Sequence, residues 1–249
     1  MHIPAELPIH LLHRRQVATL ATHAREPAGF PYPSALPYAT DARHRPVILV
    51  SALAEHTRNL DADPRAGFLV ADEAPPVATA PPAPADTSAH EATNDVANDA
   101  AAPAAAVLEA QRMTLLGRFT AAGDDAHLAA RYQRYHPDAA RYLALGDFSL
   151  RVLEIERLRF IGGFGRMGWV ESAELDALPP LSFEEEQALW ASYPGGNNEA
   201  ICLLGVDRFG ADWRIAGRLQ RTNFGEAAHD FTALELALRE ISANFGLPR

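Results

Sequence analysis

The chain has 249 residues, of which 48% are hydrophobic, and it carries a formal net charge of −10. Its length accommodates one large or two small domains, and its composition is that of a globular protein rather than a disordered one. The acidic balance, with no concentrated basic face, argues against a nucleic-acid partner, and the lack of 18 consecutive apolar residues argues against a membrane-spanning helix. The N-terminus lacks the apolar core of a signal peptide, so we expect a cytoplasmic protein with no membrane partner.

Residue types that are missing exclude several kinds of chemistry. The sequence contains no lysine, so all 22 basic residues are arginine. This excludes a Walker A phosphate loop and any lysine Schiff base, including pyridoxal-phosphate catalysis. The single cysteine, Cys202, excludes an internal disulfide and a cysteine-rich metal site. Recognition of phosphate or carboxylate groups therefore depends on arginine, histidine, hydroxyl groups and backbone N–H groups.

The N-terminal part of the chain is predicted to be mostly strands. Leu7, Leu11 and Leu12 have helical spacing, which predicts a short helix over residues 5–15. Turn-forming Pro, Gly and Asp residues then separate the strands predicted over residues 16–22, 31–40, 45–50 and 65–72, and one short helix precedes the last of these strands. This order favours a barrel or antiparallel sheet over a doubly wound α/β fold.

Residues 74–106 interrupt this pattern. Of these 33 residues, 20 are Ala or Pro, and none is aromatic, Lys or Arg. We interpret the segment as a disordered loop inserted between two strands of one domain, and the alternative is a linker between domains. The insertion is favoured because residues 111–121 have the pattern of another strand of the same sheet.

The remaining elements complete one domain and form a second. Asp124 or Asp125 is predicted to cap a helix, and a shorter helix follows His136. Two strands over residues 147–170 come next, and they complete a first domain that spans residues 1–172. Residues 178–249 are predicted to form a small α+β domain with a capped helix, a strand-turn-strand and a terminal helix. The predicted turn between those strands spans residues 207–210.

Polar side chains gather just past one predicted buried strand, in the stretch "SALAEHTRNLDADPR" (residues 51–65). Nine positions hold two hydroxyls, a histidine, an arginine and an asparagine, namely Ser51, His56, Thr57, Arg58 and Asn59. A strand that turns into a short helix presents free N–H groups and the positive end of the helix dipole, which suits an anion. The alternative is an ordinary capped surface helix.

Four motifs in the same order resemble the pyridoxamine 5′-phosphate oxidase-related split-barrel family. They are "SALAEHTRNLDADPRAGFLV", "QRMTLLGRF", "RYHPDAARYLALGDFSL" and "FIGGFGRMGWV". The closest branch is the haem-utilisation (HugZ-like) group, in which a flavin-binding barrel carries a C-terminal α+β domain. The resemblance covers residues 10–170 well and the rest loosely. It implies an FMN-binding, six-stranded split β-barrel followed by a small α+β domain, and a homodimer with each flavin at the subunit interface.

The resemblance also implies which residues contact the flavin. The phosphate contacts correspond to Ser51, His56, Thr57 and Arg58. The second strand, through Ser34, would pass alongside the flavin ring or phosphate. A compact dianion such as the FMN phosphate suits a helix start with an arginine and hydroxyls nearby.

Two positions, Arg112 and Gly67, and the absence of lysine also bear on this assignment. Arg112 matches a polar position that often reaches the flavin from the partner subunit, and the alternative is an exposed arginine at a strand end. Phosphate sites in this family often include a lysine, which this chain cannot supply. Gly67 stands where relatives more usually have a serine, which removes one hydroxyl near the cofactor.

Few histidines of the chain are candidate haem ligands. A haem-degrading function would need an axial histidine, and relatives carry a histidine- and asparagine-rich segment where this chain reads "YPGGNNEAI". His136 and His229 remain candidates, with ordinary solvated or capping roles as the alternative. No HExxH metal motif and no hydrolase triad are present, so we predict no metal site.

The resemblance therefore implies an FMN-dependent oxidoreductase acting on a small molecule, with haem or another flat conjugated compound as substrate. In such a protein the cofactor transfers the electrons and no side chain need act as a covalent catalyst, so no catalytic residue is assigned. The alternative is a non-catalytic split-barrel dimer that binds haem or a partner protein.

Overall fold

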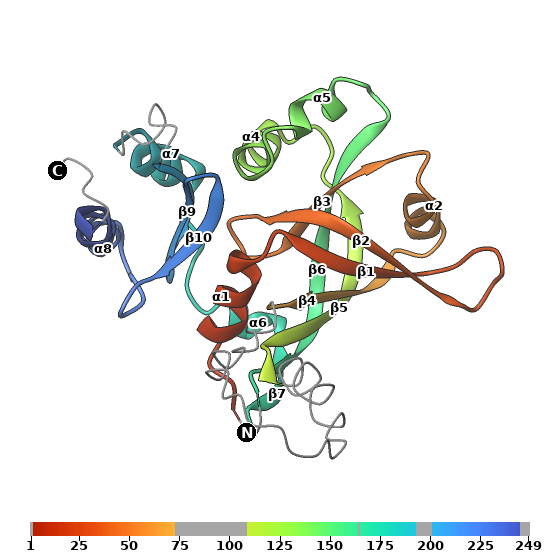
Figure 1. Ribbon diagram of the computed structural model, residues 1–249, viewed down its shortest axis with the longest axis horizontal. Coiled ribbons are helices and arrows are strands. Elements are labelled where there is room, and N and C mark those ends of the chain that lie inside the picture. Colours follow the sequence, from red (N-terminus) through yellow and green to blue (C-terminus); the bar gives the residue numbers. More distant parts are fainter. Residues whose placement is uncertain (1, 73–108, 164, 193–200, 245–249) are drawn as a thin grey trace, which may run out of the picture.

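The structure is a computed structural model that describes residues 2–72, 109–163, 165–192 and 201–244 (Figure 1). The predicted Ala/Pro-rich insertion at 74–106 lies outside the described residues. None of the described helices is long and apolar enough to cross a membrane. The domain boundaries at 172 and 178 stay a prediction.

Strands and short helices alternate along the described chain. In order they are α1 Glu6–Arg14, β1 Val17–His23, β2 Pro31–Thr40, β3 Pro46–Ser51, α2 Glu55–Ala62, β4 Arg65–Ala71, β5 Arg112–Ala121, α4 Ala126–Tyr135, α5 Ala139–Leu143, β6 Phe148–Ile161, β7 Met167–Glu171, α6 Ser172–Leu175, α7 Phe183–Ser192, β8 Ile201–Asp207, β9 Gly210–Ile215, β10 Arg218–Asn223 and α8 Phe231–Asn244.

The first seven strands form one antiparallel sheet, most of which closes into a barrel. Their order in the sheet is β3-β2-β1-β4-β5-β6-β7, and β3 also pairs with β6. The second pairing closes six strands into a barrel and leaves β7 as an extension beside β6. The predicted fold class, a split β-barrel followed by a small α+β part, is confirmed.

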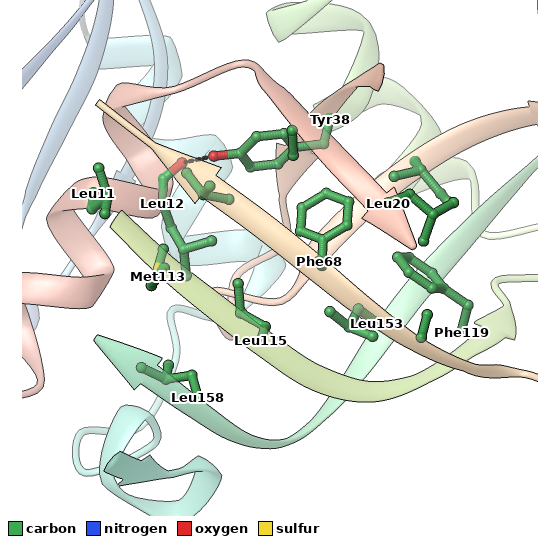
Figure 2. Close-up of a cluster of buried hydrophobic side chains, with 14 of the residues drawn as sticks. Leu11, Leu12, Leu20, Tyr38, Phe68, Met113, Leu115, Phe119, Leu153 and Leu158 are labelled. Atoms are coloured by element: carbon green, nitrogen blue, oxygen red, sulfur yellow. Dashed lines mark hydrogen bonds between the residues drawn. The ribbon is translucent and has the colours of Figure 1, made fainter. Parts of the chain in front are cut away.

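Buried and exposed residues alternate along the barrel strands, and the buried side chains fill the inside of the barrel. Tyr38, Phe68 and Phe119 form a chain of edge-to-face rings, with centroids 5.3 and 5.9 Å apart (Figure 2). Such pairs stabilise a core beyond the area that they bury. The Tyr38 hydroxyl donates a 2.7 Å hydrogen bond to the carbonyl of Leu12, which attaches α1 to the barrel.

The C-terminal part has its own sheet, in the order β10-β9-β8, and its own core around Trp213, Leu234 and Leu238. The predicted strand-turn-strand was incomplete, because this segment forms three strands. Ala216 and Gly217 adopt left-handed φ values of 48° and 79°, which make a tight turn between β9 and β10.

Two helices connect the barrel to the C-terminal sheet. Helix α1 contacts β2 and β4 of the barrel as well as β9 and β10, and it lies between the two parts in Figure 1. Helix α4, capped by the Asp125 side chain, packs Tyr132 and Tyr135 against barrel residues and against Leu204 of β8. Gly205 makes this approach possible, since a Cβ there would lie 2.3 Å from the Tyr135 hydroxyl oxygen.

Candidate functional site

A cavity of about 540 Å³ opens on the outer side of the barrel, next to α4 and α5. This volume lies within the range of roughly 300–1,000 Å³ found for pockets that bury small molecules. The walls are mostly apolar or aromatic. They are formed by Leu36, Pro37, Leu49, Val50, Ser51, Ala54, His56, Tyr132, Tyr135, His136, Pro137, Asp138, Ala139, Arg141, Tyr142 and Phe148.

The turn after β3 forms one edge of the cavity. Ser51 ends the strand, and its Oγ accepts a 3.1 Å hydrogen bond from the backbone N–H of Leu53 while donating a 2.7 Å hydrogen bond to Asp147. The backbone N–H of Ala52 donates to the carbonyl of Asp147 at 2.8 Å. These bonds fix the start of α2 to the start of β6.

Two histidines line the cavity from different elements. His56 comes from the first turn of α2, and in the described part of the chain no hydrogen bond holds its ring. His136 follows α4, and its Nε2 lies 2.8 Å from the carbonyl oxygen of Tyr38, to which it donates. Burial lowers the pKa of both imidazoles, so both are neutral at neutral pH and each offers a lone pair.

A cation and two aromatic rings lie together on another wall. Arg141 is exposed, donates a 2.8 Å hydrogen bond to the Tyr142 hydroxyl and lies 4.7 Å from the centre of that ring. The rings of Tyr142 and Phe148 have centroids 5.2 Å apart. This wall can pack against a flat apolar ligand and offers a positive charge to its acidic substituents.

The structure brings together only part of the predicted site. Ser51 and His56 both line the cavity. Thr57 is buried, and its Oγ1 has no hydrogen-bond partner in the described part of the chain. Arg58 is exposed, with its guanidinium 3.7 Å from Glu55. Ser34 lies on β2 opposite Leu20, two residues before the cavity residue Leu36.

Arg112 lies far from the other predicted contacts within one chain. Ser51 pairs with Phe148, the first residue of β6, whereas Arg112 pairs with Ile161, the last. The whole length of the longest strand therefore separates the two. Arg112 can contribute to this site only from a second subunit.

Carboxylates surround the groups predicted to bind the flavin phosphate. Glu55 lies near both Arg58 and Arg25, at 3.7 and 3.5 Å, and Asp147 accepts the hydrogen bond of Ser51. Two arginines and two carboxylates cancel in charge. These four side chains therefore offer a flavin phosphate no net positive charge, and Arg141 is the cation that lines the cavity itself.

Sequence reasoning missed three residues that line the cavity, and also Asp147, which is bonded to the cavity residue Ser51. Asp147, Arg141, Tyr142 and Phe148 all lie in the motif "RYHPDAARYLALGDFSL", which served only to establish the family resemblance. The close spacing of arginine and aromatic residues in this motif was a sequence signal that could have indicated a ligand-binding wall. Only the pairing of β3 with β6 shows that this motif lies beside the turn after β3.

The closed six-stranded barrel with its extra strand and small C-terminal sheet defines a split-barrel protein. A family model described as "CREG, beta-barrel" matches residues 4–176, which is more than half of the chain. The chain belongs to this CREG β-barrel family. No match was found among proteins with curated descriptions.

Solved structures share this architecture. A protein of unknown function from Agrobacterium tumefaciens, Atu2129, is similar over 95% of this chain and 94% of its own, with a TM-score of 0.65 and 21% identity. A haem binding protein from Mycobacterium smegmatis is similar over 98% of both chains, with a TM-score of 0.53 and 25% identity. A Clostridium acetobutylicum protein of the pyridoxinephosphate oxidase family covers 69% of this chain and 96% of its own, with a TM-score of 0.44 and 10% identity.

Proposed function

We propose that this split-barrel protein binds haem in the cavity between β3, α2, α4 and α5. The observation that carries the proposal is the combination of an apolar cavity of about 540 Å³ with two neutral histidines in its wall. The similarity to the M. smegmatis haem binding protein, which extends over both the barrel and the C-terminal sheet, supports it.

The residues of the cavity have the types that haem requires. Bound haem would supply an iron centre that an imidazole nitrogen of this cavity would hold. His56 is our candidate for this ligand because burial lowers the pKa of its imidazole and no hydrogen bond to a described residue engages the ring. Tyr142 and Phe148 would pack on the porphyrin, and the Arg141 guanidinium would pair with a propionate.

FMN-dependent oxidoreductase activity is the second candidate. It is favoured by one observation, the buried Thr57 hydroxyl at the start of α2, which lacks a hydrogen-bond partner among the described residues. The cancelling charges around Ser51 and Arg58 weigh against it. The prediction of FMN as cofactor, and of haem or a related molecule as substrate, stays untested, as does the cytoplasmic location.

A homodimer is part of both proposals. Arg112, at the far end of β6 from Ser51, can reach such a site only from a partner subunit. The outer face of the barrel that carries Arg112 also exposes large apolar side chains.

The experiment is an absorption titration of the purified protein with haem and, separately, with FMN. We expect a shifted Soret band that saturates at one haem per chain, and we expect His56→Ala to weaken haem binding at least 10-fold with a changed Soret position. His229→Ala is the matched control, because His229 is exposed on the C-terminal part and does not line the cavity.

Two outcomes would overturn the haem proposal. One is wild-type protein that gives no saturable Soret shift. The other is an unchanged spectrum and affinity in both His56→Ala and His136→Ala. A protein that purifies yellow, or that shifts the absorbance of added FMN, would instead support the flavin candidate.

A further inference from the structure

A buried polar cluster lies between the barrel and the C-terminal sheet, and Tyr135 belongs to the wall of the cavity and also contacts this cluster. His13 comes from the last turn of α1, His44 from the loop between β2 and β3, and Asp207 from the end of β8. All three side chains are buried, together with Asp212 of β9 and Arg221 of β10. Three parts of the chain that are distant in sequence thus bring ionisable groups to one point.

Three donor atoms converge in this cluster. His13 Nε2 lies 3.0 Å from His44 Nδ1 and 3.6 Å from Asp207 Oδ2, and the three atoms all lie within 4.8 Å of one another. In a tetrahedral zinc site, metal-ligand bonds of about 2.0–2.1 Å place ligand atoms about 3.3 Å apart. The observed separations lie on either side of that value.

Neighbouring groups orient these donors as they do in known zinc sites. His13 Nδ1 lies 2.6 Å from Asp212 Oδ2, so this nitrogen carries the proton and Nε2 is left to face His44 and Asp207. The Tyr135 hydroxyl donates to the same carboxylate at 2.6 Å. A carboxylate behind a ligating histidine is the usual arrangement around protein-bound zinc, where it fixes the tautomer and raises the basicity of the ring.

The charge of the cluster also suits a cation. Arg221 contacts Asp207 at 2.6 and 2.9 Å and Asp212 at 3.1 Å, so one guanidinium faces two carboxylates. Among these three side chains the carboxylates outnumber the guanidinium by one, and the next buried cation, Arg131, interacts with Asp212 but shares Glu186 with Arg134. An excess of buried negative charge is costly unless a cation compensates it.

The backbone at His44 is a further reason to look for a ligand. His44 has a φ of 62°, in the left-handed region that normally favours glycine. A histidine costs more than glycine in this conformation and persists where its side chain is held by other groups. Here the conformation turns the His44 Nδ1 toward His13 Nε2.

We propose that His13, His44 and Asp207 bind a zinc ion that fastens the C-terminal sheet to the barrel. When zinc binds, His44 Nδ1 gives up the proton that it donates to His13 Nε2 and His44 Nε2 takes one up from solvent, so both imidazoles bind as neutral ligands, and the zinc ion releases the waters that the three donors replace. Two imidazoles and a carboxylate are ligands that zinc accepts, and a bound water would complete the usual four-coordinate site, which lies buried among α1, β8 and β9. This inference is independent of haem binding.

The test measures zinc in the intact protein and in a variant that should still fold. His44→Gly removes one ligand and places glycine where φ is positive, so the loop keeps its conformation. After dialysis against micromolar zinc and then metal-free buffer, we expect about one zinc per wild-type chain by elemental analysis. His44→Gly should retain less than a tenth of that amount, and its zinc affinity in a chelator competition should fall at least 100-fold.

Controls separate a metal site from a purely hydrogen-bonded cluster. His10→Ala removes another buried histidine of α1, beside Arg221 but outside the three ligands, and should leave the zinc content unchanged. Zinc removal by a chelator should lower the melting temperature of wild type and leave that of His44→Gly unaffected. Wild-type protein that holds no zinc, or His44→Gly protein that holds as much as wild type, would overturn the proposal.

Discussion

At the scale of single residues, two buried threonines near α2 differ in the hydrogen bonding of their hydroxyl groups. Thr57 Oγ1 has no hydrogen-bond partner in the described part of the chain. Thr22 Oγ1 donates to the Tyr32 carbonyl at 3.4 Å and accepts from the Asn59 side chain at 3.1 Å. A buried hydroxyl stabilises a fold only when it is bonded, so the same substitution should have opposite effects at these positions.

We therefore expect Thr57→Val to raise the free energy of unfolding by about 1 kcal/mol, because valine has the same shape and no polar group to desolvate. Denaturant unfolding measures this directly. Thr22→Val is the matched comparison and should lower the free energy of unfolding by about 2 kcal/mol, since it leaves the buried Asn59 amide without its partner. A destabilised Thr57→Val protein would show that the hydroxyl is bonded, and weaker FMN binding in this variant would place it at a flavin phosphate.

At the scale of elements, the pairing of β5 with β6 contains a β-bulge. The register shifts between Leu116 and Gly117, so that β6 contributes one extra residue there. Such a bulge bends the strand and increases its twist, which helps the sheet to close on itself. A Cβ on Gly117 would lie 2.1 Å from the carbonyl oxygen of Glu154.

Gly117→Ala should therefore lower the free energy of unfolding by about 3 kcal/mol, because backbone would have to move to admit the methyl group. Gly67, on the neighbouring strand β4, is the control, since a Cβ there would meet only ordinary contacts at 3.9 and 4.0 Å. Gly67→Ala should stay within about 0.5 kcal/mol of wild type. Equal effects of the two substitutions in thermal unfolding would contradict this account of the bulge.

Elements were easier to predict from sequence than the site. Alternation and turn residues locate β2 at the predicted 31–40 and the capped helix α4, because these signals are local. The tight turn at Ala216 was missed, since alanine gives no sign of a left-handed φ. Asp147 beside Ser51, and His44 beside His13, come together only through strand pairing and helix packing, which the sequence does not display.

At the scale of the whole molecule, the barrel exposes one apolar outer face. Cross-strand pairing places Leu69, Thr114, Arg159 and Trp169 in one row across four strands. Leu69 and Trp169 are 40% and 45% exposed, and Leu116, two residues after Thr114, is 39% exposed. Apolar side chains gathered on one sheet face mark an interaction surface, whereas single exposed ones need no explanation.

Arg112 also belongs to this outer face, because it precedes Thr114 and Leu116 by two and four residues on the same strand, before the bulge. A second copy of the chain that packed on this face would cover the exposed side chains of Leu69, Leu116 and Trp169. It would also give Arg112 a route to the cavity of its partner, which no contact within one chain provides. This is the arrangement that the family resemblance implies.

We expect the protein to be a dimer in solution and Leu116→Arg to convert it to a monomer, because the substitution buries an unpaired charge at the centre of the proposed interface. Analytical ultracentrifugation measures the mass. Leu236→Arg is the control, since Leu236 is 60% exposed on α8 of the C-terminal part and its substitution should leave the dimer intact. A monomeric wild type, or a Leu116→Arg protein that stays dimeric with an unchanged dissociation constant, would place the partner, if there is one, on another face.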